Sequence, residues 1–295
     1  MKMQKVLSLK DELAKKNPKL HGKFFLTEKF DGWYVQIHYN PATGWESPIS
    51  SAGRHIPSLA WLKEEFNSLQ FPKLSTPFIL IAEVYLEGTP FHITNGLLNR
   101  SVGDCSLRGI TFVLHDCLDI TTIALNAKDR LDSLINFRSY IYPHKDYHFD
   151  LISILDVAEY NYGKWQTIFD SVVNNGGEGI IAKRIDSFYS SGKRNSDLLK
   201  LKLECTVEAV AIELEHTIGE KGNPGLTLVS QLANGIKVRT VINKHEDIAL
   251  FTNNSSLLGN TVVQLKAMEE LEDGQLRQPV FQFIRHDKLV SDILK

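Results

Sequence analysis

The chain of 295 residues contains only three cysteines, Cys105, Cys117 and Cys205, and these lie far apart. Cysteines so few and so widely spaced form neither a disulfide framework nor a zinc site of the usual close spacing. Their scarcity excludes a small disulfide-rich secreted fold and indicates a reducing interior. We therefore expect a cytoplasmic protein, or one in the host cytoplasm if the source is viral.

Long apolar runs are also missing. No stretch of 18 residues is apolar throughout, so the sequence predicts no membrane-spanning helix and no membrane partner. The opening stretch, MKMQKVLSLKDELAKK, has no long apolar core and no small-residue cleavage site. It predicts a short amphipathic helix rather than a signal peptide.

Neither sign of charge is in large excess. The formal net charge is −2, so a surface that binds nucleic acid must be a local patch. The common phosphate-binding signatures are absent as well. The sequence contains no Gly-x-x-x-x-Gly-Lys-Ser/Thr loop, no Gly-x-Gly-x-x-Gly between a strand and a helix, and no kinase motif, which disfavours those nucleotide-binding folds.

What the sequence does contain is a mixture of helical and strand patterns over its first two thirds. Apolar periodicity and apolar runs predict helices over 57–69, 127–137 and 163–175, and strands over 77–86, 109–119, 178–184 and 198–204. Because strands and helices do not alternate strictly, the pattern indicates an α+β fold with a mostly antiparallel sheet.

The pattern changes near residue 204. Short strand-like runs follow, separated by Gly, Asn and charged turns, at 205–215, 225–233, 235–242, 260–271 and 279–285, with one helical stretch at 244–254. Short strands with a helix among them, in roughly 90 residues, predict a small all-β barrel of the OB-fold type. We expect two domains, residues 1–203 and 204–295.

The stretch TEKFDGWY places Lys29, Asp31 and Gly32 between two strand-like segments. Asp-Gly is a strong turn dipeptide, so one interpretation is a plain hairpin turn. More ionisable residues interrupt apolar strands: Glu83, Glu178, Lys183, Lys200 and Lys202. Each alone is typical of a structural ion pair, but together they predict one polar site for a polyphosphate with a divalent metal.

A lysine beside an Asp-Gly turn has one further use in such a site. Its amine can attack the α-phosphate of a nucleotide and form a covalent intermediate. The amine must be deprotonated to attack, and neighbouring cations and desolvation would lower its pKa. This interpretation makes Lys29 the candidate nucleophile.

The order of these motifs resembles that of the covalent nucleotidyltransferases, specifically ATP-dependent DNA ligases of the minimal viral and bacterial type. The matching segments are KFDG (29–32), SSAGRHIP (50–57), Glu83, FVLHD (112–116), EGIIAK (178–183), LLKLK (198–202) and LRQPVFQFIRHDK (276–288). The resemblance implies an adenylation domain followed by an OB-fold domain. It also implies ATP and Mg²⁺ as cofactors, with Mn²⁺ as a substitute, and a monomer that acts on nicked duplex DNA.

The resemblance implies three steps. Lys29 attacks ATP and expels pyrophosphate, AMP passes to the 5′-phosphate of a nick, and the 3′-hydroxyl then displaces AMP. Asp31 and Glu178 would organise the metal, although Asp31 could also serve as a partner of the lysine. Lys183, Lys200 and Lys202 would stabilise charge on the α-phosphate.

The other ATP-binding positions also follow from the resemblance. Thr27 stands where the family reads the adenine amino group, with Glu28 beside it. Glu83 would contact the ribose or orient Lys29, and either Phe112 or His115 would supply the ring that stacks on the base. Arg285 and Lys288 are expected to act on the pyrophosphate.

The sequence departs from the family at two arginine positions. Tyr34 stands where the family usually has arginine after the Asp-Gly pair, and Ser51 replaces the arginine of Ser-Arg-x-Gly. Arg54, nearby, is the expected replacement for one of them. A local basic patch with Arg184, Lys193 and Arg194 is the predicted contact with DNA.

Four alternatives are considered. An RNA ligase or a GTP-using mRNA capping enzyme shares the core motifs, and the segment 276–288 together with the expected barrel disfavours both. An NAD⁺-dependent ligase is disfavoured because only 28 residues precede Lys29 and there is no cysteine quartet. The non-enzymatic alternative is an OB-fold module that binds nucleic acid without chemistry.

Overall fold

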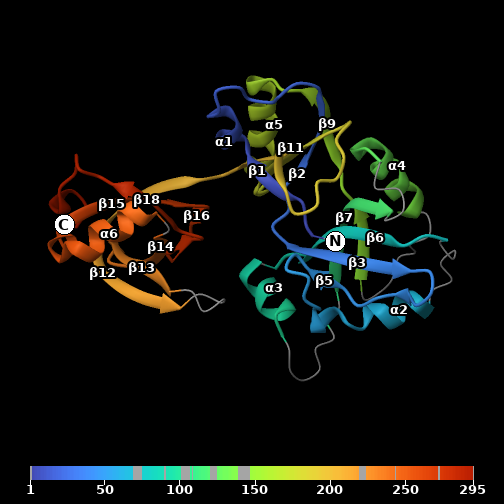
Figure 1. The fold of residues 1–295 in the computed structure, drawn as a ribbon, viewed down its shortest axis with the longest axis horizontal. Helices are drawn as coiled ribbons and strands as arrows, with labels where there is room; N and C mark the ends of the chain where they lie inside the picture. Colours follow the sequence, from blue (N-terminus) through green and yellow to red (C-terminus); the bar gives the residue numbers. More distant parts are fainter. Residues whose placement is uncertain are drawn as a thin grey trace. The chain divides into compact units, whose positions relative to one another are not determined.

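The computed structural model divides into two compact units, residues 1–202 and 203–295 (Figure 1). It describes residues 2–68, 75–89, 91–100, 107, 109–119, 125–138, 147–218, 224–242, 244–271 and 273–294. Cys105 lies outside these residues, and both Cys117 and Cys205 are free thiols. None of the helices in the described segments is long and apolar enough to cross a membrane.

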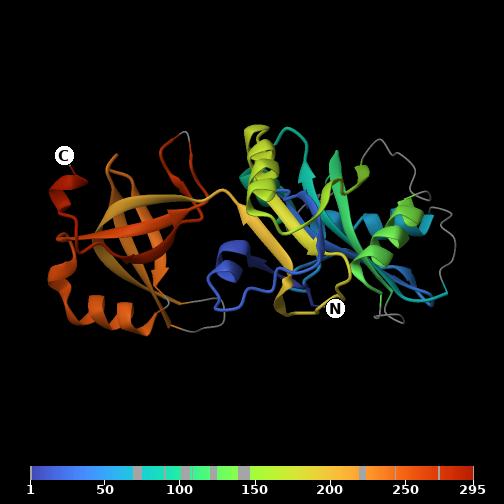
Figure 2. The ribbon, with the colours of Figure 1, turned by 90° about the horizontal axis from the view of Figure 1, so that it is seen from above.

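The first unit contains a sheet of five strands. Their order is β1 (Lys5–Ser8), β11 (Arg194–Lys202), β10 (Gly179–Arg184), β2 (Lys23–Glu28) and β9 (Ile154–Glu159). Only β1 and β11 pair in parallel. Helix α5 (Tyr162–Asn174) packs against this sheet through Trp165 and Ile168 (Figure 2). Helix α1 (Leu9–Leu13) follows β1 directly.

The start of the chain corrects one expectation. The sequence predicted a helix over the opening stretch, but residues 5–8 form a strand and only residues 9–13 are helical. The strand forms because its backbone pairs with β11, a partner that is remote in sequence. Local apolar spacing cannot reveal such a partner.

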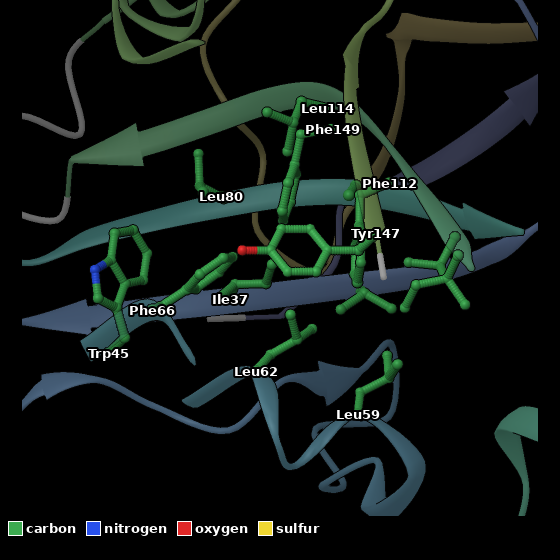
Figure 3. Packing of buried hydrophobic residues seen from close by; sticks show 14 of the residues in the cluster. Ile37, Trp45, Leu59, Leu62, Phe66, Leu80, Phe112, Leu114, Tyr147 and Phe149 are labelled. Carbon is green, nitrogen blue, oxygen red and sulfur yellow. The ribbon is translucent and has the colours of Figure 1, made fainter. Parts of the chain in front are cut away.

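The second sheet of this unit runs β4 (Gly44–Trp45), β3 (Trp33–Asn40), β6 (Phe78–Leu86), β7 (Ile110–Asp119) and β8 (Tyr147–Leu151), and β5 (Ile49–Ser50) pairs with β3. The pairings are antiparallel except for β7 with β8. The remaining elements here are η1 (Pro57–Leu59), α2 (Leu62–Ser68), α3 (Phe91–Leu98) and α4 (Ala127–Arg138). One face of the sheet holds the largest apolar core, with Trp45, Phe66, Tyr147 and Phe149 (Figure 3).

The second unit contains a sheet of five strands around its own core. The order is β14 (Lys237–Ile242), β13 (Pro224–Leu232), β12 (Cys205–Ile218), β15 (Thr261–Ala267) and β18 (Val280–Ile284), all antiparallel. Strict alternation of exposed and buried residues along β14 leaves one face for the core. The other elements are α6 (His245–Asn253), η2 (Ser255–Leu257), the hairpin β16 (Glu269–Glu270) with β17 (Leu276–Arg277), and η3 (Val290–Asp292). The chain is therefore a mixed fold of helices and strands in which strands predominate.

Candidate active site

Lys29 follows the end of β2 and meets Glu178, which precedes β10. The Lys29 Nζ donates a hydrogen bond to Glu178 Oε2 at 2.5 Å, and the Lys29 backbone N–H donates to the Gly179 carbonyl at 2.8 Å. Gly179 has φ of +151°, and a Cβ there would lie 2.2 Å from the Leu201 carbonyl oxygen. Glycine is therefore required at the position that brings Glu178 to the lysine.

The Asp-Gly pair is not a hairpin turn. Strand β2 before it pairs with β10 and β9, whereas β3 after it pairs with β6, so the segment crosses from one sheet to the other. Gly32 makes the crossing possible, because a Cβ at this position would lie 2.7 Å from the Val84 carbonyl oxygen. The crossing places Lys29 between the two sheets.

A cavity of about 250 Å³ lies between these sheets. Residues from both sheets line it, and the sequence-predicted ones among them are Thr27, Glu28, Lys29, Glu83, His115 and Lys183. The structure thus brings together side chains that are separated by more than 150 residues in the sequence. A cavity with charged groups at its walls and apolar residues between them suits a nucleotide.

Carboxylates and lysines are concentrated at the Lys29 end. Burial raises the pKa of Glu83 to about 7, against the opposing charge of Lys29, with Glu178 and Asp31 adding to the rise. Burial also lowers the pKa of Lys200, and the neighbouring Lys202 and Lys29 lower it further. These mutual influences show one electrostatically coupled cluster.

Lys183 joins the two sheets through its ammonium group. Its Nζ donates to Asp116 Oδ2 and to the His115 carbonyl, each at 2.9 Å. In the pairing of β10 with β11, Ile181 is opposite Lys200 and Gly179 is opposite Lys202. Because side chains alternate along a strand, Lys183 lies on the same sheet face as Lys200, two residues from the position opposite it.

Asp116 is the buried centre of this second cluster. Besides Lys183 it accepts a hydrogen bond from Arg130 Nε at 2.8 Å, and both Asp116 and Arg130 are buried. Burial alone would raise the pKa of Asp116, but Lys183 and Arg130 outweigh it and lower the pKa to about 2. The carboxylate is thus held in its charged form.

Asp116→Asn is expected to lower the free energy of unfolding by about 3–5 kcal/mol, because it leaves Arg130 buried without its counter-charge. In the parent, the stabilisation from ionised Asp116 is present above pH 4 and is lost as pH falls toward the folded-state pKa of about 2. Urea unfolding at pH 7 and at low pH measures both effects. Equal free energies of unfolding of parent and variant at pH 7 would contradict the stabilising role of the ionised Asp116 carboxylate.

The two candidate stacking rings have different locations. Phe112 is fully buried and stacks on Phe149 with ring centroids 4.7 Å apart, inside the apolar core (Figure 3). Phe112 therefore does not reach the cavity. His115 lines the cavity, with its ring centroid 6.2 Å from that of Tyr34. Burial and the neighbouring Lys183 lower the pKa of His115 to about 4, so its ring is neutral near pH 7.

The predicted arginines are not cavity residues. Arg54 lies in an exposed turn after β5, where its backbone contacts Ser50. Arg184, expected to contact DNA, is only 6% exposed, and its guanidinium donates to Asp197 and to the Lys19 carbonyl. Arg184 is therefore a structural residue. Lys193 and Arg194 are exposed, as a DNA contact requires.

Arg285 and Lys288 belong to the second unit and share a carboxylate there. Arg285 donates to both oxygens of Asp287, at 2.8 and 2.7 Å, and to Glu208 at 2.5 Å. The Lys288 Nζ lies 3.7 Å from the same Glu208. The segment 285–288 is thus held against β12 through Glu208.

Comparison with protein families gives a match over most of the first unit. The model of the ATP-dependent DNA ligase domain matches residues 4–202. The chain belongs to this family. It is a DNA ligase that uses ATP.

Solved structures of DNA ligases share the fold of this ligase. A Lig E DNA ligase has a TM-score of 0.69 and 16% identity, with 97% of this chain and 99% of that chain covered. The bacteriophage T7 ligase in complex with ATP has a TM-score of 0.54 and 18% identity, with coverage of 96% and 98%. The Chlorella virus ligase-adenylate has a TM-score of 0.50 and 17% identity, with coverage of 97% and 99%. No curated protein sequence matches the chain.

The fit of a metal ion to this ligase rests on few donors. Within the described segments, no group of three or more His, Cys, Asp or Glu side chains converges as a metal-binding cluster. Mg²⁺ is usually held by one or two carboxylates together with phosphate oxygens of the substrate. The two carboxylates Glu178 and Asp31, which both raise the pKa of Glu83, fit such an ion, bound together with a nucleotide.

Sequence reasoning missed some residues of the cavity wall. Met3, Gln4 and Val6 line it, as do Tyr34 and Tyr189. The Gln4 backbone N–H donates to the Tyr189 hydroxyl at 2.9 Å. Of these residues, Tyr34 had a signal in the sequence, because it replaces a family arginine. Val6 belongs to β1, which pairs with β11, and Gln4 meets Tyr189 through a hydrogen bond between segments remote in the sequence.

Proposed function

We propose that this ligase seals 5′-phosphate/3′-hydroxyl nicks in duplex DNA through a covalent Lys29–AMP intermediate. The observation that carries the proposal is the contact of Lys29 Nζ, at the cavity wall, with Glu178. Lys200 and Lys202 are close enough for the charges of Lys29 and Lys202 to lower the pKa of Lys200. An amine nucleophile, a carboxylate and two further cations near one another suit attack on the α-phosphate of a nucleotide.

The attack requires the lone pair on Lys29 Nζ, so the proton that this amine shares with Glu178 has to leave. Glu178 Oε2, at 2.5 Å, is within reach to accept it. The new N–P bond forms as the bond from the α-phosphorus to pyrophosphate breaks. Lys200 and Lys202 are proposed to balance the negative charge that develops on the phosphate oxygens.

Glu178 and Asp31 would hold a divalent metal when the nucleotide is present. Such an ion supplies charge neutralisation for the phosphates. Glu83, with its pKa raised to about 7 by burial, can both donate and accept a hydrogen bond near neutral pH. We assign Glu83 to a ribose hydroxyl or to the orientation of Lys29.

His115, Thr27 and Lys183 are proposed to hold the adenine. His115 supplies a neutral ring from β7, and Thr27 lines the cavity from β2. The Lys183 ammonium, fixed by Asp116, presents a donor for a ring nitrogen of the base. We propose this contact for Lys183 in place of the contact with the α-phosphate that the resemblance implied.

The second unit is proposed to be an OB-fold barrel. The strand order β14-β13-β12-β15-β18, with α6 between β14 and β15, supports this topology. The partner of such a pair of domains is proposed to be nicked duplex DNA. We also propose that the ligase is a monomer and that it is located in the cytoplasm.

Glu178→Gln is expected to slow formation of the Lys29–AMP adduct by about 10–100-fold, because the amide can neither accept the Lys29 proton nor hold a metal as the carboxylate does. The melting temperature is expected to change little. Rates are measured with α-labelled ATP over a series of Mg²⁺ concentrations. A variant with the parent rate and the parent Mg²⁺ dependence would remove Glu178 from the site.

A direct test of the proposed function uses two assays. Incubation with α-labelled ATP or GTP, followed by a denaturing gel, shows which nucleotide becomes attached. Sealing of a nicked DNA duplex, compared with a nicked RNA duplex, separates this function from that of an RNA ligase or capping enzyme. Labelling by GTP alone, or sealing of RNA alone, would overturn it.

A further inference from the structure

The residues before α1 run along the turn that leads into β11. The Lys5 N–H donates to the Lys193 carbonyl at 2.8 Å, and the Gly192 N–H donates to the Met3 carbonyl at 3.2 Å. The Lys2 N–H donates to Ser191 Oγ at 3.2 Å. Figure 2 shows the start of the chain beside the yellow loop that precedes β11. The backbone of residues 2–5 is thus fixed at several points.

This pairing gathers cations from two distant parts of the sequence. Lys5 is the register partner of Arg194, and neighbouring strands lie about 4.8 Å apart. A Cβ at Gly192 would be 3.4 Å from the Lys2 Cδ, so the Lys2 side chain passes over the turn next to Lys193. Lys2, Lys5, Lys193 and Arg194 are all exposed. We call these four residues the β1–β11 patch.

The charge of the patch is uncompensated by carboxylates. Among the described residues, none of the four cations forms an ion pair with Asp or Glu, whereas the nearby Arg184 is paired with Asp197 and Lys15 with Glu12. The protein as a whole has a net charge of −2. Four adjacent unpaired cations are therefore a local departure from the average surface and favour an anionic partner.

The patch also adjoins the candidate active site. The pKa of Lys200 is lowered mainly by burial, then by Lys202 and Lys29, and to a smaller extent by Arg194. The charge of Arg194 is therefore within electrostatic reach of the lysines around Lys29. Met3, Gln4 and Val6, which are the sequence neighbours of the two lysines, line that cavity. One segment therefore forms a wall of the cavity and carries cations outside it.

We infer that the β1–β11 patch binds the phosphate backbone of duplex DNA beside the site of sealing, with Lys2 and Lys5 contributing as much as Lys193 and Arg194. The inference rests on the proposed function, because it places the substrate of that reaction. A duplex is the matching partner, since its closely spaced phosphates can contact several adjacent cations at once.

The test measures binding of a labelled nicked duplex by the full chain over a series of KCl concentrations. Each lost phosphate contact lowers the slope of log K against log salt by about 0.9. Lys2→Gln/Lys5→Gln is expected to reduce the slope by about 2 and to weaken binding most at low salt. Lys193→Gln/Arg194→Gln is expected to produce a reduction of similar size.

The matched control is Lys63→Gln/Lys128→Gln, which removes two exposed lysines from helices α2 and α4. The control is expected to keep the parent slope. An unchanged slope in Lys2→Gln/Lys5→Gln, or an equal loss in the control, would overturn the inference. Glutamine leaves the backbone hydrogen bonds of residues 2–5 in place, so both variants are expected to fold.

A second readout separates this inference from the proposed function. Labelling by α-labelled ATP in the absence of DNA is expected to proceed at the parent rate in Lys2→Gln/Lys5→Gln, because these lysines are outside the cavity. Slower labelling would mean that they act on ATP and would overturn the inference. Absence of labelling in the parent would instead defeat the proposed function itself.

Discussion

Lys29→Ala is expected to abolish covalent labelling by α-labelled ATP, a loss of at least about 10³-fold, since removal of a covalent nucleophile eliminates its step. The amine of Lys29 reaches into the cavity from the crossing between the two sheets and contacts Glu178. The ammonium of Lys183 is bound to Asp116 and to a backbone carbonyl. It is therefore not placed to replace Lys29.

The same variant is expected to retain sealing of a nick that already carries 5′-AMP, because that step forms no bond to the lysine. Lys63→Ala, an exposed lysine on α2, is the control for loss of a positive charge. Circular dichroism and thermal melting establish that Lys29→Ala is folded. Labelling that survives in a folded Lys29→Ala protein would show that another residue is the nucleophile.

Arg285→Ala is expected to slow formation of the Lys29–AMP adduct by about 10²–10³-fold, the range found when a charge-stabilising group is removed from a site. Pyrophosphate is expelled only in the first step. Sealing of a pre-adenylylated nick is therefore expected to stay near the parent rate. Lys288→Ala is expected to show the same pattern to a smaller extent.

A purely structural role predicts a different result. Arg285 contacts Asp287 and Glu208 within the second unit, so its loss could simply weaken that unit. In that case the melting temperature, the rate of Lys29–AMP formation and the rate of sealing of a pre-adenylylated nick would fall in parallel. Glu208→Gln provides the matched control, because it removes the same ion pair while keeping Arg285. A similar loss of activity in Glu208→Gln and Arg285→Ala would defeat the pyrophosphate role.

Much of the fold could be predicted because its apolar patterns are local. The runs at 77–86 and 109–119 form the buried strands β6 and β7, and 127–137 forms α4 within one residue. The lysines of LLKLK share a strand face because side chains alternate along β11. Such features depend on neighbours in the sequence, so a single sequence is sufficient to find them.

The parts that could not be predicted depend on partners remote in the sequence. Phe112 and His115 lie on opposite faces of β7, but which face meets the cavity depends on how the two sheets pack: Phe112 lies in the apolar core and His115 lines the cavity. The contact of Lys183 with Asp116 joins strands of two different sheets, at positions 67 residues apart. The strand at residues 5–8 exists only through β11. No local pattern contains this information.

The parallel pairing of β1 with β11 has a consequence for the order in which the molecule is made. Lys2 and Ser191, which are hydrogen-bonded, are 189 residues apart. At about 5–20 residues per second, translation separates their synthesis by roughly 10–40 s. During this interval β1 has no partner, and the cavity lacks the wall formed by Met3, Gln4 and Val6. A nascent chain that stops before β11 is therefore expected to leave an unpaired strand available to chaperones and to be unable to retain a nucleotide.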